Sequence, residues 1–328
     1  MNYDIVIVGA GPAGISMAAE AVHAGIHPEK ILIIEKATEH SFSIKKYYPD
    51  NKLVTANYKG FEAKCIGVMC IPDLNKHETI SYLDQAIEEN GLKVNYSETV
   101  WKIHQNDDFT FIIYTDKGEY NAKVITIAIG ILGKPNKPTY KLPLSLKNTT
   151  LFDITSTEIS NAKVLVVGGG DSASEYAQYL TQAGNTVTLS YRKDKFTRMN
   201  SINRISLEAL ASRGEVALYL NSDISEVQDL SGKPKVVFTD REPEEFDFVV
   251  YALGGSTPVN FLKSIGIDFD GQDPVLKEHH ETSVRGLFLL GDLTAGTKGG
   301  SIIWAFNSSR TVINRICDEY FPNCGIKD

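Results

Sequence analysis

Two cysteines that stand five positions apart, Cys65 and Cys70 in "AKCIGVMCIP", are the residues most directly suited to redox chemistry. As a thiolate pair they could close to a disulfide and exchange two electrons with a neighbouring group. The chain has four cysteines among 328 residues, too few for a disulfide scaffold, so reduced thiols are the general expectation. The spacing leaves open both a redox-active disulfide and a simple pair of thiols, and the surrounding elements must decide between them.

A glycine-rich loop near the N-terminus is suited to bind the pyrophosphate of a dinucleotide. A buried strand is predicted over residues 5–8, a helix after the loop, and a second buried strand over 31–34. The loop carries three glycines in the fingerprint spacing: Gly9, Gly11 and Gly14. They make the tight turn, admit the pyrophosphate and let helix and strand pack closely, in that order. Glu35 ends the second strand, where its carboxylate can accept hydrogen bonds from both hydroxyls of a ribose.

A second loop of the same kind follows a strand predicted over residues 164–167. Its three fingerprint positions are Gly168, Gly170 and Ala173. The next predicted strand, 186–189, leads to Ser190 instead of an acid, and a basic run follows: Arg192, Lys193 and Arg198. A carboxylate there would repel a 2′-phosphate, whereas basic side chains bind it. The second loop therefore suits NADPH and the first suits the AMP half of FAD. The alternative is that the basic run is only a solvated turn.

The order of these units predicts two domains. Strands predicted over 124–129 and 248–253 each lead into a segment rich in glycine and proline, which we interpret as connectors. The predicted fold class is α/β, with two Rossmann-like three-layer dinucleotide-binding domains, the second inserted into the first. We expect residues 1–131 and 256–328 to form a discontinuous FAD-binding domain and residues 132–255 to form the NADPH-binding domain.

Composition narrows the classes of partner. The formal net charge of −8 argues against nucleic acid. No stretch approaches 18 uncharged apolar residues, so we expect no integral membrane segment. The N-terminal apolar run lacks a basic region and a cleavage site, so we expect no signal peptide and a cytoplasmic location.

Several motifs in sequence order resemble the thioredoxin-reductase-like FAD/NAD(P)H oxidoreductases of low molecular weight. They are "GAGPAG" with Glu35, "AIG" at 128–130, "GGGDSASE" at 168–175, "YRKDKF", and "GD" at 291–292. The resemblance implies FAD and NADPH as cofactors, a homodimer, and chemistry that needs no obligatory catalytic side chain and no metal. It implies FAD contacts at Gly9, Gly11, Pro12, Ala13, Gly14, Glu35, Lys36, Asn57, Val100, Ala128, Gly130, Gly291, Asp292, Ser301, Ile302 and Ile303. It implies NADPH contacts at Gly168, Gly170, Asp171, Ser172, Ala173, Glu175, Arg192, Lys193 and Arg198, with Glu175 near the nicotinamide.

One departure from that family concerns the cysteines. Thioredoxin reductases of this size carry a CxxC just before the second glycine loop, and the corresponding interval here has no cysteine. Cys65 and Cys70 resemble the "CxxxxCxP" centre of lipoamide dehydrogenase and glutathione reductase, but they follow Glu35 by 30 residues and lack the preceding glycine pair. We therefore interpret them as buried or partly buried thiols, and Cys317 and Cys324 as structural or surface thiols. A zinc site with His77 lacks a fourth ligand.

Without a protein disulfide, electrons must leave from the flavin itself. The pattern is closest to bacterial flavodoxin or quinone reductases and ferredoxin–NADP reductases of the thioredoxin reductase type. Lysines could dock an acidic flavodoxin, or could simply be solvated: Lys45, Lys46, Lys134, Lys137 and Lys141. The alternative is a reductase of a low-molecular-weight disulfide such as bacillithiol disulfide. A flavin monooxygenase is less favoured because its FxGxxxH fingerprint is missing.

Overall fold

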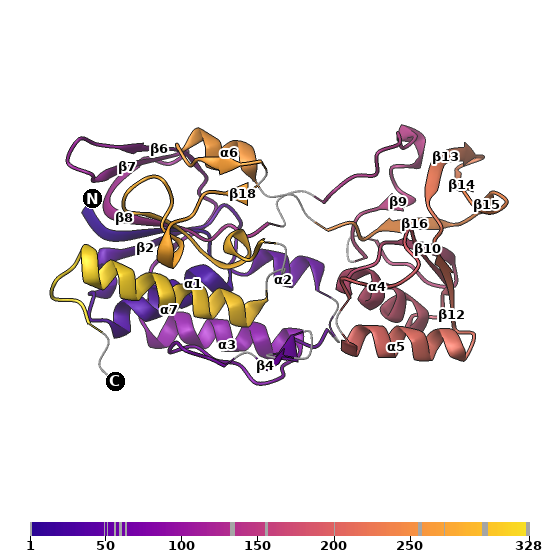
Figure 1. Ribbon diagram of the computed structural model, residues 1–328, viewed down its shortest axis with the longest axis horizontal. Coiled ribbons are helices and arrows are strands. Elements are labelled where there is room, and N and C mark those ends of the chain that lie inside the picture. Colours follow the sequence, from indigo (N-terminus) through magenta and orange to yellow (C-terminus); the bar gives the residue numbers. More distant parts are fainter. Residues whose placement is uncertain are drawn as a thin grey trace.

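The computed structural model folds into two lobes, and the first and last described residues lie on the larger one (Figure 1). It describes residues 2–325 apart from 49, 51, 56, 59–60, 63, 132–134, 155–156, 200, 255–257, 272 and 297–300. For residues 57, 58, 61, 62 and 202 the backbone alone is described. Within this part of the chain, none of the helices has the length and apolar character needed to cross a membrane.

The larger lobe is built on a mixed sheet in the order β5-β2-β1-β8-β7-β6, with β19 also paired to β8. Its strands are β1 (Asn2–Val8), β2 (Ile31–Ile34), β5 (Val94–Asn95), β6 (Val100–Gln105), β7 (Phe111–Thr115), β8 (Glu119–Ile127) and β19 (Leu287–Leu289). The pairs among β5, β2, β1, β8 and β19 are parallel, and β8, β7 and β6 form an antiparallel meander. The central strands are apolar on both faces because both faces are covered, as the continuous apolar runs predict.

Helices α1, α3 and α7 pack together beside this sheet (Figure 1). They span α1 (Pro12–His23), α3 (Lys76–Glu89) and α7 (Ile302–Glu319), and shorter helices are α2 (Phe42–Tyr47) and α6 (Val259–Ser264). A capping box of Asn75 and Glu78 starts α3, and Ser301 caps α7 by accepting a hydrogen bond from Trp304 N at 3.0 Å. Short strands complete the lobe: β3 (Asn57–Tyr58), β4 (Phe61–Glu62), β17 (Phe269–Asp270) and β18 (Asp273–Pro274).

The smaller lobe repeats the plan on a parallel sheet in the order β12-β11-β10-β16-β9. Its strands are β9 (Thr150–Leu151), β10 (Lys163–Val167), β11 (Thr186–Tyr191), β12 (Val216–Leu220) and β16 (Phe248–Tyr251). Helices α4 (Asp171–Gln182) and α5 (Ser201–Ser212) cover one face. An antiparallel sheet of β13 (Ile224–Leu230), β14 (Lys233–Phe238) and β15 (Glu244–Glu245) packs its apolar side against the parallel sheet.

The predicted fold class is confirmed, because each lobe is a dinucleotide-binding α/β unit with strand, glycine loop, helix and parallel strand in the expected order. The strands expected over 124–129 and 248–253 end earlier, at Ile127 and Tyr251. The predicted domain junctions at 131/132 and 255/256 fall at residues outside the described part, as do Gly133 and Gly255. The domain bounds therefore stay a prediction.

Candidate functional site

A cavity of about 460 Å³ opens at the carboxyl ends of β1, β2 and β8, where the first glycine loop begins. Open α/β sheets bind their ligands at this edge. Sixteen FAD contacts were predicted, and the following ones line the cavity: Gly9, Gly11, Pro12, Ala13, Glu35, Lys36, Val100, Ala128, Gly130, Gly291, Asp292, Ser301 and Ile302. The sequence placed these residues far apart, and the fold brings them around one space.

The first glycine loop forms a cradle of backbone. A Cβ atom on Gly14 would lie 2.0 Å from Gly9 O, and one on Gly9 would lie 2.6 Å from Ala128 O. A side chain at either position would therefore collide with main chain. Gly11 differs, because a Cβ there would meet no protein atom within 4 Å, and Gly11 is also the N-cap of α1. The free space beside Gly11, in front of the α1 N-terminus, fits a pyrophosphate.

Glu35 holds the end of β2 against the glycine loop. One carboxylate oxygen accepts a hydrogen bond from Ala10 N at 2.8 Å, and the other accepts one from Ala37 N at 2.8 Å. These two bonds fix the orientation of the carboxylate at the cavity wall. Each oxygen keeps a further lone pair that can accept a hydrogen bond from a ribose hydroxyl.

Asp292 follows β19 and lines the other end of the cavity. Burial raises the pKa of its carboxyl from the ordinary 3.8 to about 6. A partly buried carboxylate needs hydrogen-bond donors, and the hydroxyls of a ribityl chain would supply them. The need of this carboxyl for hydrogen-bond donors therefore fits the flavin end of FAD.

The raised pKa of Asp292 predicts a pH-dependent penalty in the flavin-free protein. Because the native state holds this proton more tightly than the unfolded state, the free energy of unfolding falls as pH rises from about 4 to above 6. We expect Asp292→Asn to stabilise the apoprotein at pH 8 by about 2 kcal/mol, with little change at pH 4.5. Urea unfolding of both apoproteins at the two pH values measures this. An equal shift at both pH values would contradict the assignment of the raised pKa to Asp292.

The N-terminus of α7 reaches the same cavity. Ser301 and Ile302 line it, whereas Ile303 is 1% exposed and packs in the apolar core between the sheet and the helices. The side chain of Ile303 points away from that of Ile302 because one helical step separates them, and the expected flavin contact of Ile303 stays a prediction. The end of an 18-residue helix carries partial positive charge, which favours an anionic group in the cavity. Asn57 belongs to β3, and its side chain lies outside the described residues.

Several walls of the cavity were not predicted from the sequence as cofactor contacts. Aromatic side chains from α2, from the residue after it and from α6 contribute: Phe42, Tyr47, Tyr48 and Phe261. The signal that could have found Tyr47 and Tyr48 is the aromatic pair "YY" at the end of a short amphipathic segment after the ribose acid. Flat aromatic surfaces suit a planar ring system such as an isoalloxazine.

The second glycine loop shares two features with the first. A Cβ on Gly168 would lie 2.4 Å from Ala252 O, and one on Gly170, the N-cap of α4, would meet nothing within 4 Å. Asp171 and the exposed Ser172 lie in the first turn of α4, and Ala173 is buried beneath the loop. This backbone opening at a helix N-terminus fits a second pyrophosphate.

The basic run lies where the 2′-phosphate of NADPH is expected. Near the end of β11, the hydroxyl of Ser190 donates a hydrogen bond to Ser222 O at 3.0 Å. Ser190 has no carboxylate that could repel a phosphate at this position. Arg192, Lys193 and Arg198 follow with exposed side chains. Glu175 lies one turn along α4 from Asp171 and forms an ion pair with Lys52 of the larger lobe at 2.7 Å.

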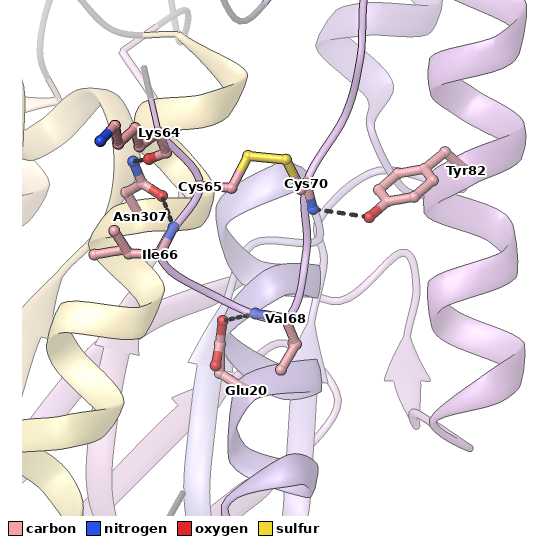
Figure 2. Close-up of a disulfide and its surroundings, with 8 residues drawn as sticks. All are labelled: Glu20, Lys64, Cys65, Ile66, Val68, Cys70, Tyr82 and Asn307. Atoms are coloured by element: carbon pink, nitrogen blue, oxygen red, sulfur yellow. Dashed lines mark hydrogen bonds between the residues drawn. A yellow bond between two sulfur atoms is a disulfide. The ribbon is translucent and has the colours of Figure 1, made fainter. Parts of the chain in front are cut away.

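The structure corrects the expectation of reduced cysteines. Cys65 and Cys70 form a disulfide with their Cα atoms 5.6 Å apart, and Cys317 and Cys324 form another with their Cα atoms 4.9 Å apart. Among the described residues no free cysteine remains. Figure 2 shows the disulfide between Cys65 and Cys70 and the loop that it closes. Within this loop a Cβ on Gly67 would lie 2.1 Å from Glu20 Oε1, so the chain passes directly over that side chain.

Hydrogen bonds hold the loop between the two cysteines against α1, α3 and α7 (Figure 2). They are Val68 N to Glu20 Oε1 (2.8 Å), Ile66 N to Asn307 Oδ1 (3.1 Å), Asn307 Nδ2 to Lys64 O (2.9 Å) and Cys70 N to the Tyr82 hydroxyl (3.0 Å). Beneath the loop, Glu20 is fully buried and lies 3.1 Å from Arg310 Nε. In the described part of the chain, residues 64–70 contribute nothing to the cavity wall. The disulfide therefore staples a surface loop and does not face the flavin site.

The sequence of this chain is similar to known proteins of one family. Residues 6–291 match the pyridine nucleotide-disulphide oxidoreductases. A ferredoxin–NADP reductase from Ignicoccus hospitalis is 32% identical over 310 residues, which cover 90% of this chain and 91% of that protein. A ferredoxin–NADP reductase from Halalkalibacterium halodurans is 24% identical, with 95% and 92% covered.

Solved structures share the fold. A bacillithiol disulfide reductase from Staphylococcus aureus superposes with a TM-score of 0.82 at 22% identity, covering 98% of this chain and 99% of that one. A thioredoxin reductase from T. acidophilum gives a TM-score of 0.77 at 24% identity, covering 95% and 96%. At these identities the likeness establishes the fold alone.

Proposed function

Because this chain belongs to the pyridine nucleotide-disulphide oxidoreductase family, we propose that it carries electrons from NADPH through FAD to a one-electron carrier, a ferredoxin or a flavodoxin. The chain is an NAD(P)H-dependent oxidoreductase that uses FAD and NADPH. The identity of the acceptor is the proposal, with a quinone as a further candidate. We also propose a cytoplasmic homodimer, as the sequence predicted.

The position of the cysteines carries the proposal. The Cys65–Cys70 loop is bound to α1, α3 and α7 and does not contribute to the flavin cavity, and the smaller lobe has no CxxC. A protein that reduces disulfides through its own dithiol needs that dithiol beside the flavin. Electrons that reach the cavity would therefore leave from the flavin to an acceptor that docks at its edge.

The side chains of this protein would bind and orient the cofactors. FAD, when bound, supplies the exchange between two-electron and one-electron transfer. Gly11 and the α1 N-terminus would hold its pyrophosphate, Glu35 its ribose, and Asp292 its ribityl hydroxyls. The α7 N-terminus would stabilise negative charge at the ring, and Tyr48 and Phe261 would exclude water from it.

Exposed lysines support docking of an acidic carrier, and they are Lys137 and Lys141 of the connector and Lys46 of α2. Lys45 is paired with Glu39 at 2.9 Å, and the Lys46 ammonium lies 5.3 Å from the centroid of the Tyr47 ring. Lys134 lies outside the described residues. Steering by exposed lysines would make the rate with an acidic carrier fall as salt rises.

An acceptor panel tests the proposal. The purified FAD-loaded protein is mixed with NADPH and, separately, with ferredoxin, flavodoxin, a quinone, thioredoxin and bacillithiol disulfide. We expect the highest kcat/KM with ferredoxin or flavodoxin, and a lower value at high salt. A higher kcat/KM with bacillithiol disulfide, the alternative that the sequence left open, would reject the carrier proposal.

A further inference from the structure

An ion pair joins the two lobes beside the flavin cavity. Lys52 lies between α2 and β3 in the larger lobe, and Glu175 lies on α4 in the smaller one. Their Nζ and Oε2 atoms are 2.7 Å apart, and the side chains are only 17% and 14% exposed. At this burial the pair is screened by salt much less than a surface pair.

Lys52 contacts the wall of the flavin cavity, and Glu175 lies on the helix that begins at the second glycine loop. The Lys52 ammonium lies 4.1 Å from the centroid of the Tyr48 ring, which lines the flavin cavity. Asn203 donates to Glu175 Oε1 and to Asp171 Oδ1, both at 3.2 Å, so it holds the two carboxylates on one side of the first turns of α4. The contacts run from the flavin cavity through Lys52 to the helix that begins at the second glycine loop.

We propose that Lys52 is a positioning residue for hydride transfer, because its ion pair with Glu175 aligns the NADPH-binding helix α4 with the wall of the flavin cavity. The inference rests on the proposed NADPH and FAD sites and adds a residue that neither loop motif contains. Hydride transfer requires the reacting atoms to lie about 3–3.5 Å apart, so a contact that fixes one lobe against the other acts directly on the rate.

Charge explains why a lysine suits this place. Asp171 and Glu175 are carboxylates one helical turn apart, and without a cation they would repel each other and any anionic flavin in the cavity. Burial alone would lower the pKa of Lys52, but Tyr48 and Glu175 outweigh it and raise that pKa above its ordinary value. The surroundings of Lys52 therefore favour its charged form.

The test is anaerobic stopped-flow reduction of the bound flavin by saturating NADPH. Lys52→Met should slow flavin reduction by roughly tenfold, with FAD content retained and the apparent Kd for NADPH changed far less. Lys52→Arg, which keeps the charge, should recover most of the rate. Lys76→Met is the matched control, because Lys76 is also well buried and paired, with Asp50 at 3.0 Å, but within the same lobe.

A charge swap keeps the test decisive if Lys52→Met also lowers stability. Lys52→Glu and Glu175→Lys should each be slow, and the double variant should be faster than either. Flavin reduction at the parental rate in Lys52→Met, or a double variant no faster than its single variants, would overturn the inference. Failure of the parental protein to reduce its flavin with NADPH would instead refute the proposed function.

Discussion

Replacing Gly11 by valine is expected to yield a folded protein that no longer retains FAD. A Cβ at Gly11 meets no protein atom within 4 Å, and its φ of −81° is open to any residue, so the fold tolerates the side chain. Two methyl groups would instead fill the space in front of the α1 N-terminus that the pyrophosphate needs. We expect the Kd for FAD to rise about 100-fold or more, equivalent to roughly 3 kcal/mol.

Titration of the apoprotein with FAD, followed by flavin fluorescence, measures this effect. The unfolding free energy of the apoprotein should change by no more than about 1 kcal/mol. Gly170→Val is the matched control, because the space beside Gly170 is equally open but Gly170 caps α4. This variant should weaken the binding of NADPH and leave the binding of FAD unchanged. An unchanged Kd for FAD in Gly11→Val would refute the pyrophosphate site.

Removing Arg192 and Lys193 together should abolish the preference for NADPH. Both side chains are exposed after β11, where Ser190 leaves no carboxylate to repel a phosphate. A charge-assisted contact to phosphate contributes about 1.5 kcal/mol or more, so the two alanines should raise the KM for NADPH by about 100-fold. The KM for NADH, which has no 2′-phosphate, should change less than about threefold.

Steady-state kinetics with both coenzymes measure the change in preference. Arg213→Ala provides the control, because Arg213 is paired with Glu215 beyond α5 and should alter neither KM. Equal losses with NADPH and NADH would show that the basic run shapes the lobe without reading the phosphate. The alternative of a solvated turn would then be the correct interpretation.

The sequence was sufficient to predict the parts of the fold that depend on interactions between residues close together in the chain. Strands β1 and β10, the glycine loops and the helices after them follow from apolar runs and from glycines that backbone contacts require. The acid at Glu35 and the basic run after β11 follow from the position at which each strand ends. These signals placed the part of the cavity wall formed by the first glycine loop and Glu35, because a parallel sheet aligns its strand ends. The predicted contacts after β8 and β19 and at the start of α7 came from the family resemblance.

The rest depends on contacts between distant segments. The loop between Cys65 and Cys70 passes at Gly67 directly over the buried Glu20, which lies in a helix 48 positions away from Val68. The contact between Lys52 and Glu175 joins two lobes across 123 positions of sequence, and no helical or strand periodicity predicts it. Such arrangements arise from tertiary packing, so residue spacing could not reveal them.

The central claim is that electrons leave from the flavin and never pass through Cys65 and Cys70. The most direct test is NADPH-dependent reduction of ferredoxin or flavodoxin by the double variant Cys65→Ser, Cys70→Ser. Loss of the disulfide should lower the unfolding free energy by about 2 kcal/mol, so the assay is run where the variant stays folded and FAD-loaded. Cys317→Ser, Cys324→Ser serves as the control, since it removes the disulfide at the end of α7. We predict near-parental rates in both double variants, whereas collapse of activity in the Cys65, Cys70 variant alone would contradict this account and assign the redox centre to that disulfide.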